Sequence, residues 1–189
     1  MFYGCTVLTG VTIPDGVNSI GYSTFCGCTG LTSIAIPERV TAIGDEAFKN
    51  CTGITDVVVS DSVTEIGYRA FEGCSSLTSI TLPFVGATKD GSKNTHFGYI
   101  FGAFHYGGNP TCVPSGLQTL IITGGTSIAD CAFYYCTGLT SIEMPNSMTS
   151  IGSRAFQSCS SITSIQFQGT ASQWDAVTKG NYWNEKTGA

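Results

Sequence analysis

The residues best suited to chemistry lie in one part of the chain. Both histidines, His96 and His105, and the nearby Cys112 fall between residues 84 and 116. A thiol beside an imidazole can act as a nucleophile with its general base, and the same side chains can bind a metal ion. The spacings of nine and seven residues match no zinc-binding pattern, so we predict no metal site. A thiol/histidine enzyme stays open as a hypothesis, and it requires the three side chains to lie together.

Two other catalytic patterns fail on inspection. Residues 86–93 (GATKDGSK) approach a phosphate-binding loop, but Ser92 precedes Lys93 where that motif needs Gly-Lys followed by Ser or Thr. No Gly-x-Ser-x-Gly segment marks a hydrolase nucleophile. We therefore predict a protein that is not an enzyme and uses no cofactor.

Composition narrows the classes of partner. The 189 residues carry a net charge of -5, and only 11% of them are charged, against roughly 25% in ordinary soluble domains. Eight dispersed Lys and Arg argue against binding nucleic acid or anionic membrane. A hydrophobic content of 42% argues against disorder, and no apolar stretch has the length of a transmembrane helix. The N-terminal residues also lack the pattern of a secretory signal.

A repeat of 23 residues defines the elements that position these residues. Four positions recur at that spacing: Leu8, Leu31, Ile54 and Leu77; Ile20, Ile43 and Ile66; Phe25, Phe48 and Phe71; Cys5, Cys28, Cys51 and Cys74. After an interruption the pattern resumes at Leu117 and continues to Ile162. Such a period is typical of a solenoid, because a unit this short buries its apolar side only by stacking on its neighbours.

Each unit divides into three parts. Residues 31–36 alternate apolar and polar side chains and predict a strand that Pro37 ends. Residues 40–44 predict a second short β segment, followed by a Gly suited to a positive φ or a close backbone approach. Residues 47–51 fit one helical turn, with Phe48 and Cys51 on its inner face. Seven strands are predicted, starting at residues 8, 31, 54, 77, 117, 139 and 162, around internal ladders of Phe and Cys.

The motifs Leu-Thr-Ser-Ile-x-Ile-Pro, Val-Thr-x-Ile-Gly and Ala-Phe-x-x-Cys, seen in residues 31–51, resemble the BspA-like leucine-rich repeats of bacterial and some protist surface proteins. The resemblance covers roughly residues 2–83 and 117–167. It implies a leucine-rich-repeat solenoid, β-rich and horseshoe-like, at the cell surface or secreted. Departures are Ser60 and Thr123 in place of Pro, Ala129 in place of Gly, and one residue fewer between Leu117 and Ile128.

The domain organisation follows from where the repeat holds. Residues 1–167 are predicted to form one solenoid of about seven repeats, with an insertion at 84–116. Residues 168–189 form a C-terminal lid or a linker. The first repeat begins in mid-unit, so we expect a chain cut from a longer one, and an unpaired terminal coil predicts end-to-end self-association.

The nine cysteines are predicted to be mostly buried free thiols. Nine is odd, and stacked cysteines point their Cβ atoms in parallel, which does not suit a disulfide. Six occupy the Phe-x-x-Cys position, and Cys26, Cys112 and Cys131 do not. Of these, Cys26 or Cys112 could be exposed.

Two surfaces are candidate binding sites. One is the outward strip of the strands, which a curved solenoid would place on its concave face: Thr32, Ser33, Thr55, Asp56, Thr78, Ser79, Thr81, Thr140, Ser141 and Glu143. The other is the aromatic insertion: His96, Phe97, Tyr99, Phe101, His105 and Tyr106. The alternatives are a solvated sheet whose Thr serve strand propensity, and insertion rings that pack on the solenoid.

The first functional hypothesis is a non-enzymatic module that binds protein or glycan. The resemblance implies attachment to host or extracellular matrix proteins. Alternatives are a structural spacer that displays other domains, a Thr ladder that binds ice or mineral, and the thiol/histidine enzyme. The insertion, Gln118 and Asp56 interrupt the regular array that ice binding needs.

Overall fold

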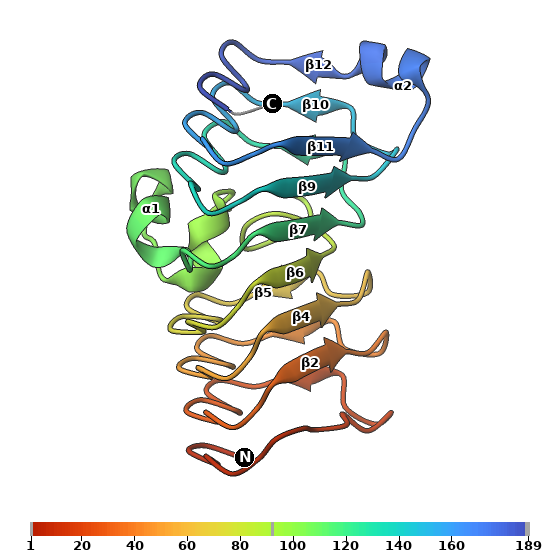
Figure 1. The fold of residues 1–189 in the computed structure, drawn as a ribbon. Helices are drawn as coiled ribbons and strands as arrows, with labels where there is room; N and C mark the ends of the chain where they lie inside the picture. Colours follow the sequence, from red (N-terminus) through yellow and green to blue (C-terminus); the bar gives the residue numbers. More distant parts are fainter. Residues whose placement is uncertain (1, 92, 188–189) are drawn as a thin grey trace.

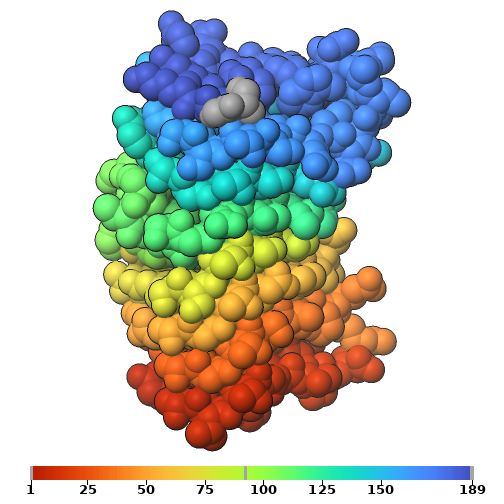
Figure 2. All heavy atoms as spheres, viewed as in Figure 1, coloured from red at the N-terminus to blue at the C-terminus, as the bar shows by residue number. Residues whose placement is uncertain are grey.

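The computed structural model describes residues 2–91 and 93–187 and shows a parallel β-solenoid (Figure 1). Six strands form a front sheet in the order β11-β9-β7-β6-β4-β2, and every neighbouring pair is parallel. Their bounds are β2 Ser33–Ile36, β4 Asp56–Val59, β6 Ser79–Leu82, β7 Thr119–Ile122, β9 Ser141–Met144 and β11 Ser164–Phe167. Figure 2 shows the coils layered in sequence order from one end to the other.

The back of the solenoid carries two separate three-stranded sheets. One contains β1 (Ser19–Ile20), β3 (Ala42–Ile43) and β5 (Glu65–Ile66), and the other contains β8 (Ser127–Ile128), β10 (Ser150–Ile151) and β12 (Thr178–Lys179). The insertion causes the division. Residues 87–89 run along β5 instead of a regular strand, with Ile66 N donating to Ala87 O at 2.9 Å and Lys89 N to Thr64 O at 3.0 Å. Only the front sheet is continuous.

The 23-residue period sets the strand register as predicted. Ile34 pairs with Val57, and Val57 pairs with Ile80, one period apart in each case. The apolar side chains of this row point inward and are buried, while the residues that alternate with them are partly or fully exposed. Alternation and β-branched side chains are what a half-buried strand requires.

The prediction of seven strands is wrong by one, because residues 8–13 form no strand. This segment has a partner on one side only, and a single backbone bond, from Thr32 N to Thr9 O at 3.4 Å, joins it to the next coil near its start. Gly10 also stands where the following coils have Ser33 and Asp56. Glycine weakens a strand, because it has no side chain to pack and loses more conformational entropy than other residues.

The helical turn predicted after the second β segment is also wrong: residues 45–50 form successive tight turns. Glu46 and Asn50 both have a φ of 57°, which a right-handed helix does not allow. Alternate N–H groups bond within the turn and to the next coil; thus Lys49 N donates to Glu46 O, and Phe48 N donates to Ala70 O at 2.8 Å. These turns form one edge of the solenoid, called the turn edge below.

Stacked phenylalanines fill the core beneath the turn edge. The rings of Phe2, Phe25, Phe48 and Phe71 stack in parallel with centroids 5.3–5.4 Å apart, and Phe133 stacks on Phe156 at 5.0 Å. Between the two stacks the insertion supplies Phe97, whose ring lies 5.0 Å from that of Phe133, and Phe101. The predicted Phe ladder is confirmed, and the insertion carries it across the interruption.

The cysteines of the repeat form a second ladder of buried thiols. All nine cysteines of the chain are free, and among the six repeat positions only Cys5 is partly exposed. Four of these thiols, those of Cys28, Cys51, Cys74 and Cys159, donate to a phenylalanine carbonyl of the preceding coil; Cys51 Sγ, for example, donates to Phe25 O at 3.0 Å. Burial raises the pKa of the Cys51 thiol to about 12. These thiols therefore stay protonated and act as small apolar groups with a donor.

The insertion folds against the turn edge as three short helices (Figure 1). They are η1 (Phe97–Phe101), η2 (Tyr106–Gly108) and α1 (Asn109–Cys112). Asn109 is fully buried and joins the insertion to the next coil, because its Nδ2 donates to Ala132 O at 3.0 Å and its Oδ1 accepts from Gly98 N at 2.9 Å. One amide thus bonds a backbone group of the insertion and a backbone group of the coil that follows it.

The C-terminal tail lies on the last coil. Thr170 begins helix α2 (Ala171–Ala176) with a capping box that includes Gln173. Strand β12 then pairs with β10, and Phe156 N donates to Trp183 O at 2.7 Å. The ring of Trp174 contacts those of Phe167 and Trp183 at 5.4 and 6.0 Å. The tail therefore supplies the back half of the coil that β11 begins. None of the described helices has the length and apolar character of a bilayer-spanning helix.

Candidate functional site

The outward strip comprises the threonines that precede the strands and two parallel rows on the front sheet itself. Strand register aligns the two rows as follows: Ser33, Asp56, Ser79, Thr119, Ser141 and Ser164 in one row, and Ala35, Val58, Thr81, Ile121, Glu143 and Gln166 in the other. The first row is small and hydroxyl-rich. The second changes from apolar at the N-terminal end to polar at the C-terminal end, where Gln168 donates to Glu143 at 2.7 Å. All ten strip residues proposed from the sequence are at least partly exposed.

The threonines that precede the strands have a structural task. The hydroxyl of Thr55 donates to Thr32 O at 3.3 Å, and that of Thr78 donates to Thr55 O at 3.1 Å. The hydroxyls of Thr32 and Thr140 donate in the same way to a backbone carbonyl of the preceding coil. The hydroxyl proton is therefore committed to the backbone, and the oxygen keeps only acceptor capacity toward solvent.

The predicted insertion residues divide by burial. Phe97 and Phe101 are at most 1% exposed and belong to the core, so they cannot meet a partner in the folded chain. His96 is also buried, and since a carbonyl only accepts, its Nε2 donates to Ala103 O at 3.0 Å. Burial lowers the pKa of His96 and favours the neutral ring. Tyr99 is partly exposed, whereas His105 and Tyr106 are exposed.

The geometry gives the thiol/histidine hypothesis no support. His96 is bonded to Ala103, and His105 Nδ1 accepts from Gly107 N at 3.1 Å. The Cys112 thiol lies 3.8 Å from the hydroxyl of Thr111. Over residues 2–91 and 93–187, no hydrogen bond joins either imidazole to this thiol, and no group of three His, Cys, Asp or Glu has the arrangement of a metal site.

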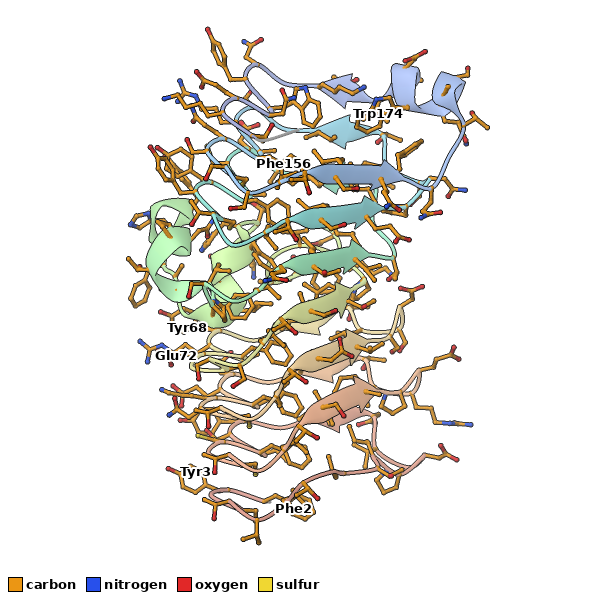
Figure 3. All side chains as sticks on the ribbon, in the orientation of Figure 1. Phe2, Tyr3, Tyr68, Glu72, Phe156 and Trp174 are labelled. Carbon is orange, nitrogen blue, oxygen red and sulfur yellow. The ribbon has the colours of Figure 1, made fainter. Side chains whose placement is uncertain are left out.

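The sequence reasoning missed three aromatic residues that lie beside the insertion on the turn edge: Tyr68, Tyr134 and Tyr135. The Tyr68 ring lies 5.2 Å from that of Phe104, and Tyr68 Oη donates to Gly102 O at 2.8 Å. Figure 3 shows Tyr68 and Glu72 on this edge, on the same side as Tyr3. A signal for the last two existed: Tyr134 and Tyr135 fill the variable positions of Phe-x-x-Cys, which the coil before the insertion fills with Glu72 and Gly73.

Tyr135 also has an unusual backbone. Its φ is 56°, and the equivalent position in other coils is Gly27, Asn50, Gly73, Ser158 or Lys186, each at a positive φ. A left-handed conformation costs an ordinary L-residue roughly 1–2 kcal/mol, and Gly and Asn tolerate it best. A bulky aromatic residue here is therefore locally unfavourable, and strain of this kind often accompanies functional positions.

A network of paired charges lies beside Tyr68. Lys49 Nζ is 3.0 Å from both Glu46 and Glu72, and Arg69 approaches the same carboxylates at 3.6 and 3.7 Å. The Arg69 guanidinium also lies 4.9 Å from the centre of the Tyr68 ring. These four charges neutralise one another across two coils, so this part of the turn edge presents little net charge.

The comparison with known families follows from this repeat geometry. Residues 1–90 and 115–177 match the family model described as BspA type Leucine rich repeat region, in six copies. The chain belongs to the BspA-type leucine-rich repeat family. The match stops at the insertion on both sides, where the back sheet divides.

Solved structures of bacterial leucine-rich repeat proteins are similar to this BspA-type chain. A leucine rich cell surface protein from Faecalibacterium prausnitzii is 30% identical, covering 88% of this chain and 34% of that one, with a TM-score of 0.44. A leucine-rich repeat protein from Eubacterium ventriosum is 18% identical over 94% of this chain and 42% of that one, with a TM-score of 0.60, and shows the same fold. The chain thus spans less than half the length of either. No curated protein matches it.

The departures from the BspA-type motif have local causes. The repeat glycines Gly44, Gly67 and Gly152 approach the preceding coil closely: a Cβ on Gly67 would lie 2.3 Å from Asp45 N. Ala129 follows the insertion, where no regular back strand precedes it, so a methyl group fits. Thr123, which replaces Pro, donates its N–H to Leu82 O at 2.9 Å, a bond that proline could not make.

Proposed function

We propose that this chain is a non-enzymatic protein-recognition module whose binding surface is the outward strip of the front sheet. The family supports this, because leucine-rich repeats form protein-interaction modules. The observation that carries the proposal is the in-register pair of rows on six strands, a continuous surface on which Asp56 and Glu143 are the only charged side chains. Depletion of charge and exposed β-branched groups suit the desolvated centre of an interface.

The proposed setting is the bacterial cell surface, with host or extracellular matrix proteins as partners. The support is the name of the 30% identical Faecalibacterium prausnitzii protein, which describes a cell surface protein. The low charge and hydroxyl-rich exterior are compatible with an extracellular location. A structural spacer is the alternative, and it predicts no partner for the strip.

The test measures binding of the whole chain to purified extracellular matrix proteins and glycans by biolayer interferometry. The diagnostic variant is Thr81→Arg, which places a long cation at the centre of the strip between Val58 and Ile121. The matched control is Ser127→Arg on the back, an exposed position in β8 with the same added charge. Replacing the whole insertion is unsuitable, because Phe97 and Phe101 would leave the core.

The proposal expects at least one saturable protein partner whose affinity falls tenfold or more with Thr81→Arg and stays unchanged with Ser127→Arg. A single buried unpaired charge at an interface has an effect of that size. Equal loss with both variants would refute the strip as the binding surface. No binding to any protein of the panel would favour the spacer.

A further inference from the structure

The most conspicuous exposed feature outside the strip is a group of aromatic rings on the turn edge. We call Phe104, His105, Tyr106, Tyr134 and Tyr135 the edge cluster. The first three belong to the insertion, and the last two belong to the turn of the following coil. Phe104 is 78% exposed, Tyr106 47% and Tyr135 41%. Contiguous exposed aromatic residues on a protein surface mark interaction sites more often than scattered ones do.

The rings of the edge cluster are held at steep angles to one another. Tyr106 meets Tyr134 at 85° with centroids 5.6 Å apart, and Tyr134 meets Tyr135 at 63° and 4.6 Å. His105 meets Tyr106 at 83°. In an edge-to-face pair, the ring that contributes its edge keeps both of its faces free of its neighbour. The ring contacts also hold these faces in fixed orientations before a ligand binds. A preformed aromatic surface loses little conformational entropy on binding.

The polar atoms of the edge cluster supply several free hydrogen-bond donors. Among the described residues, the hydroxyls of Tyr106, Tyr134 and Tyr135 make no hydrogen bond within the chain. His105 Nδ1 accepts from Gly107 N, so the proton of the neutral ring is on Nε2. The five residues include no carboxylate, ammonium or guanidinium group. The cluster therefore offers aromatic faces with free O–H groups and an imidazole N–H, without a carboxylate, ammonium or guanidinium group.

The backbone of Tyr135 is in a conformation that is unfavourable for an aromatic residue. Other coils place Gly, Asn, Ser or Lys at its left-handed position, and Tyr135 holds a φ of 56° with its ring exposed. Neither packing nor backbone geometry requires an aromatic residue there. The ring contributes a face to the cluster instead.

We propose that the edge cluster is a second binding site, separate from the strip, that takes a proline-rich segment of a partner protein in the polyproline II conformation. Such a segment has apolar rings, free carbonyl acceptors and few N–H donors, and it docks on aromatic-lined surfaces. The edge cluster, with its aromatic faces and free donors, complements each of these properties. For the hydroxyl donors of a glycan the five side chains offer no carboxylate or amide oxygen, and only the tyrosine oxygens could accept them. An acidic peptide would find no Lys or Arg among the five residues to pair with its carboxylates.

The experiment is a fluorescence anisotropy titration of labelled decaproline with the whole chain, with cellohexaose as the glycan probe by calorimetry. The variants are Tyr106→Ala and Tyr135→Asn. Matched controls are Tyr22→Ala, an exposed tyrosine on the turn edge outside the edge cluster, and Tyr182→Asn, an exposed tyrosine that also has a positive φ of 58°. Tyr135→Asn introduces a residue suited to the backbone, so circular dichroism should show a folded protein.

The expected result is saturable decaproline binding below about 1 mM, weakened tenfold or more by each edge-cluster variant and unchanged in both controls. Thr81→Arg on the strip should leave the affinity for decaproline unchanged, which separates this site from the proposed function. Three results would overturn the inference: no saturable decaproline binding, binding of cellohexaose in its place, or wild-type affinity in Tyr135→Asn.

Discussion

Substitution of Gly67 by alanine tests whether close backbone approach between coils governs stability. Gly67 N donates to Ile43 O at 2.7 Å, and Tyr68 N donates to Asp45 Oδ1 at 2.7 Å. A Cβ on Gly67 would lie 2.3 Å from Asp45 N and 2.5 Å from Gly44 C. Both neighbouring atoms belong to the backbone of the preceding coil, so no side-chain rotation can relieve the overlap.

The expected cost follows from the separation required. Non-bonded atoms need roughly 3.5 Å, so the two coils must part locally by about 1 Å. That movement stretches two bonds beyond hydrogen-bonding range, at about 1 kcal/mol each, and overpacking adds about 1–3 kcal/mol. We expect Gly67→Ala to lower the free energy of unfolding by about 3–5 kcal/mol. For a chain of this size the melting temperature should fall by about 6–20 °C.

The matched control is Gly21→Ala in the first coil. Its Cβ would meet only Thr24 Oγ1, at 3.4 Å, which is close to ordinary contact. Gly21→Ala should therefore change the free energy of unfolding by no more than about 0.5 kcal/mol. Thermal and urea unfolding followed by circular dichroism compare the two variants. A Gly67→Ala protein as stable as Gly21→Ala would refute the reasoning.

Three further predictions concern the core and the interruption. Burial raises the pKa of the Cys51 and Cys159 thiols to about 12, so the folded state favours their protonated forms. The contribution of these thiols to the free energy of unfolding should therefore be constant below their ordinary pKa near 9. It should fall by about 1.4 kcal/mol per pH unit per thiol as the pH rises toward 12. Urea unfolding at pH 8 and 10 measures this, and Cys51→Val should reduce the slope; an unchanged slope would contradict it. Asn109→Ala leaves the buried Gly98 N–H without a partner, whereas Ala132 O keeps its bond from Phe97 N at 2.9 Å. The substitution should therefore cost about 1–3 kcal/mol in urea unfolding, and a loss under about 0.5 kcal/mol would show that water replaces the amide. Trp174→Ala removes the ring that contacts Phe167 and Trp183 and should cost about 2–4 kcal/mol, with hydrogen exchange increasing first in β11 and β12; uniform change along the chain would argue against a local role.

The repeating part of the fold could be predicted because every coil repeats one solution. A spacing of 23 residues places Ile34, Val57 and Ile80 in one inward row, and the strand pairing follows that spacing. The Phe and Cys ladders follow for the same reason. The resemblance then gave the family, which the match over residues 1–90 and 115–177 confirms.

The turns could not be predicted as easily, because the spacing of side chains does not reveal the sign of the backbone φ angle. Phe48 and Cys51 share an inner face in a helical turn and also in the observed tight turns. The positive φ of Glu46 and Asn50 excludes the helical turn, and the presence of a glutamate does not predict a positive φ. The first segment fails for another reason: its alternation is intact, but Gly10 stands where the next coils have Ser33 and Asp56.

Within the candidate sites, the strip was predictable and the edge cluster was only partly so. Outward positions on a strand follow from alternation, so Thr81 and Glu143 could be placed from the sequence. The insertion has no period, and its aromatic residues look alike until burial separates Phe97 from Tyr106. Tyr134 and Tyr135 were overlooked because they belong to a regular repeat, in positions where side chains usually matter little.

The insertion's position explains how a repeat protein can gain a second surface without losing the first. It divides the back sheets between β5 and β8, yet β6 and β7 remain paired through four residue pairs of the front sheet. Phe97 and Asn109 restore the core and the backbone bonds at the break. The strip therefore stays continuous, and the exposed rings of the insertion project from the turn edge. Because the two surfaces lie on different faces, substitutions in one should change its own ligand alone, and a loss of both affinities from Tyr106→Ala would show that the insertion supports the strip mechanically.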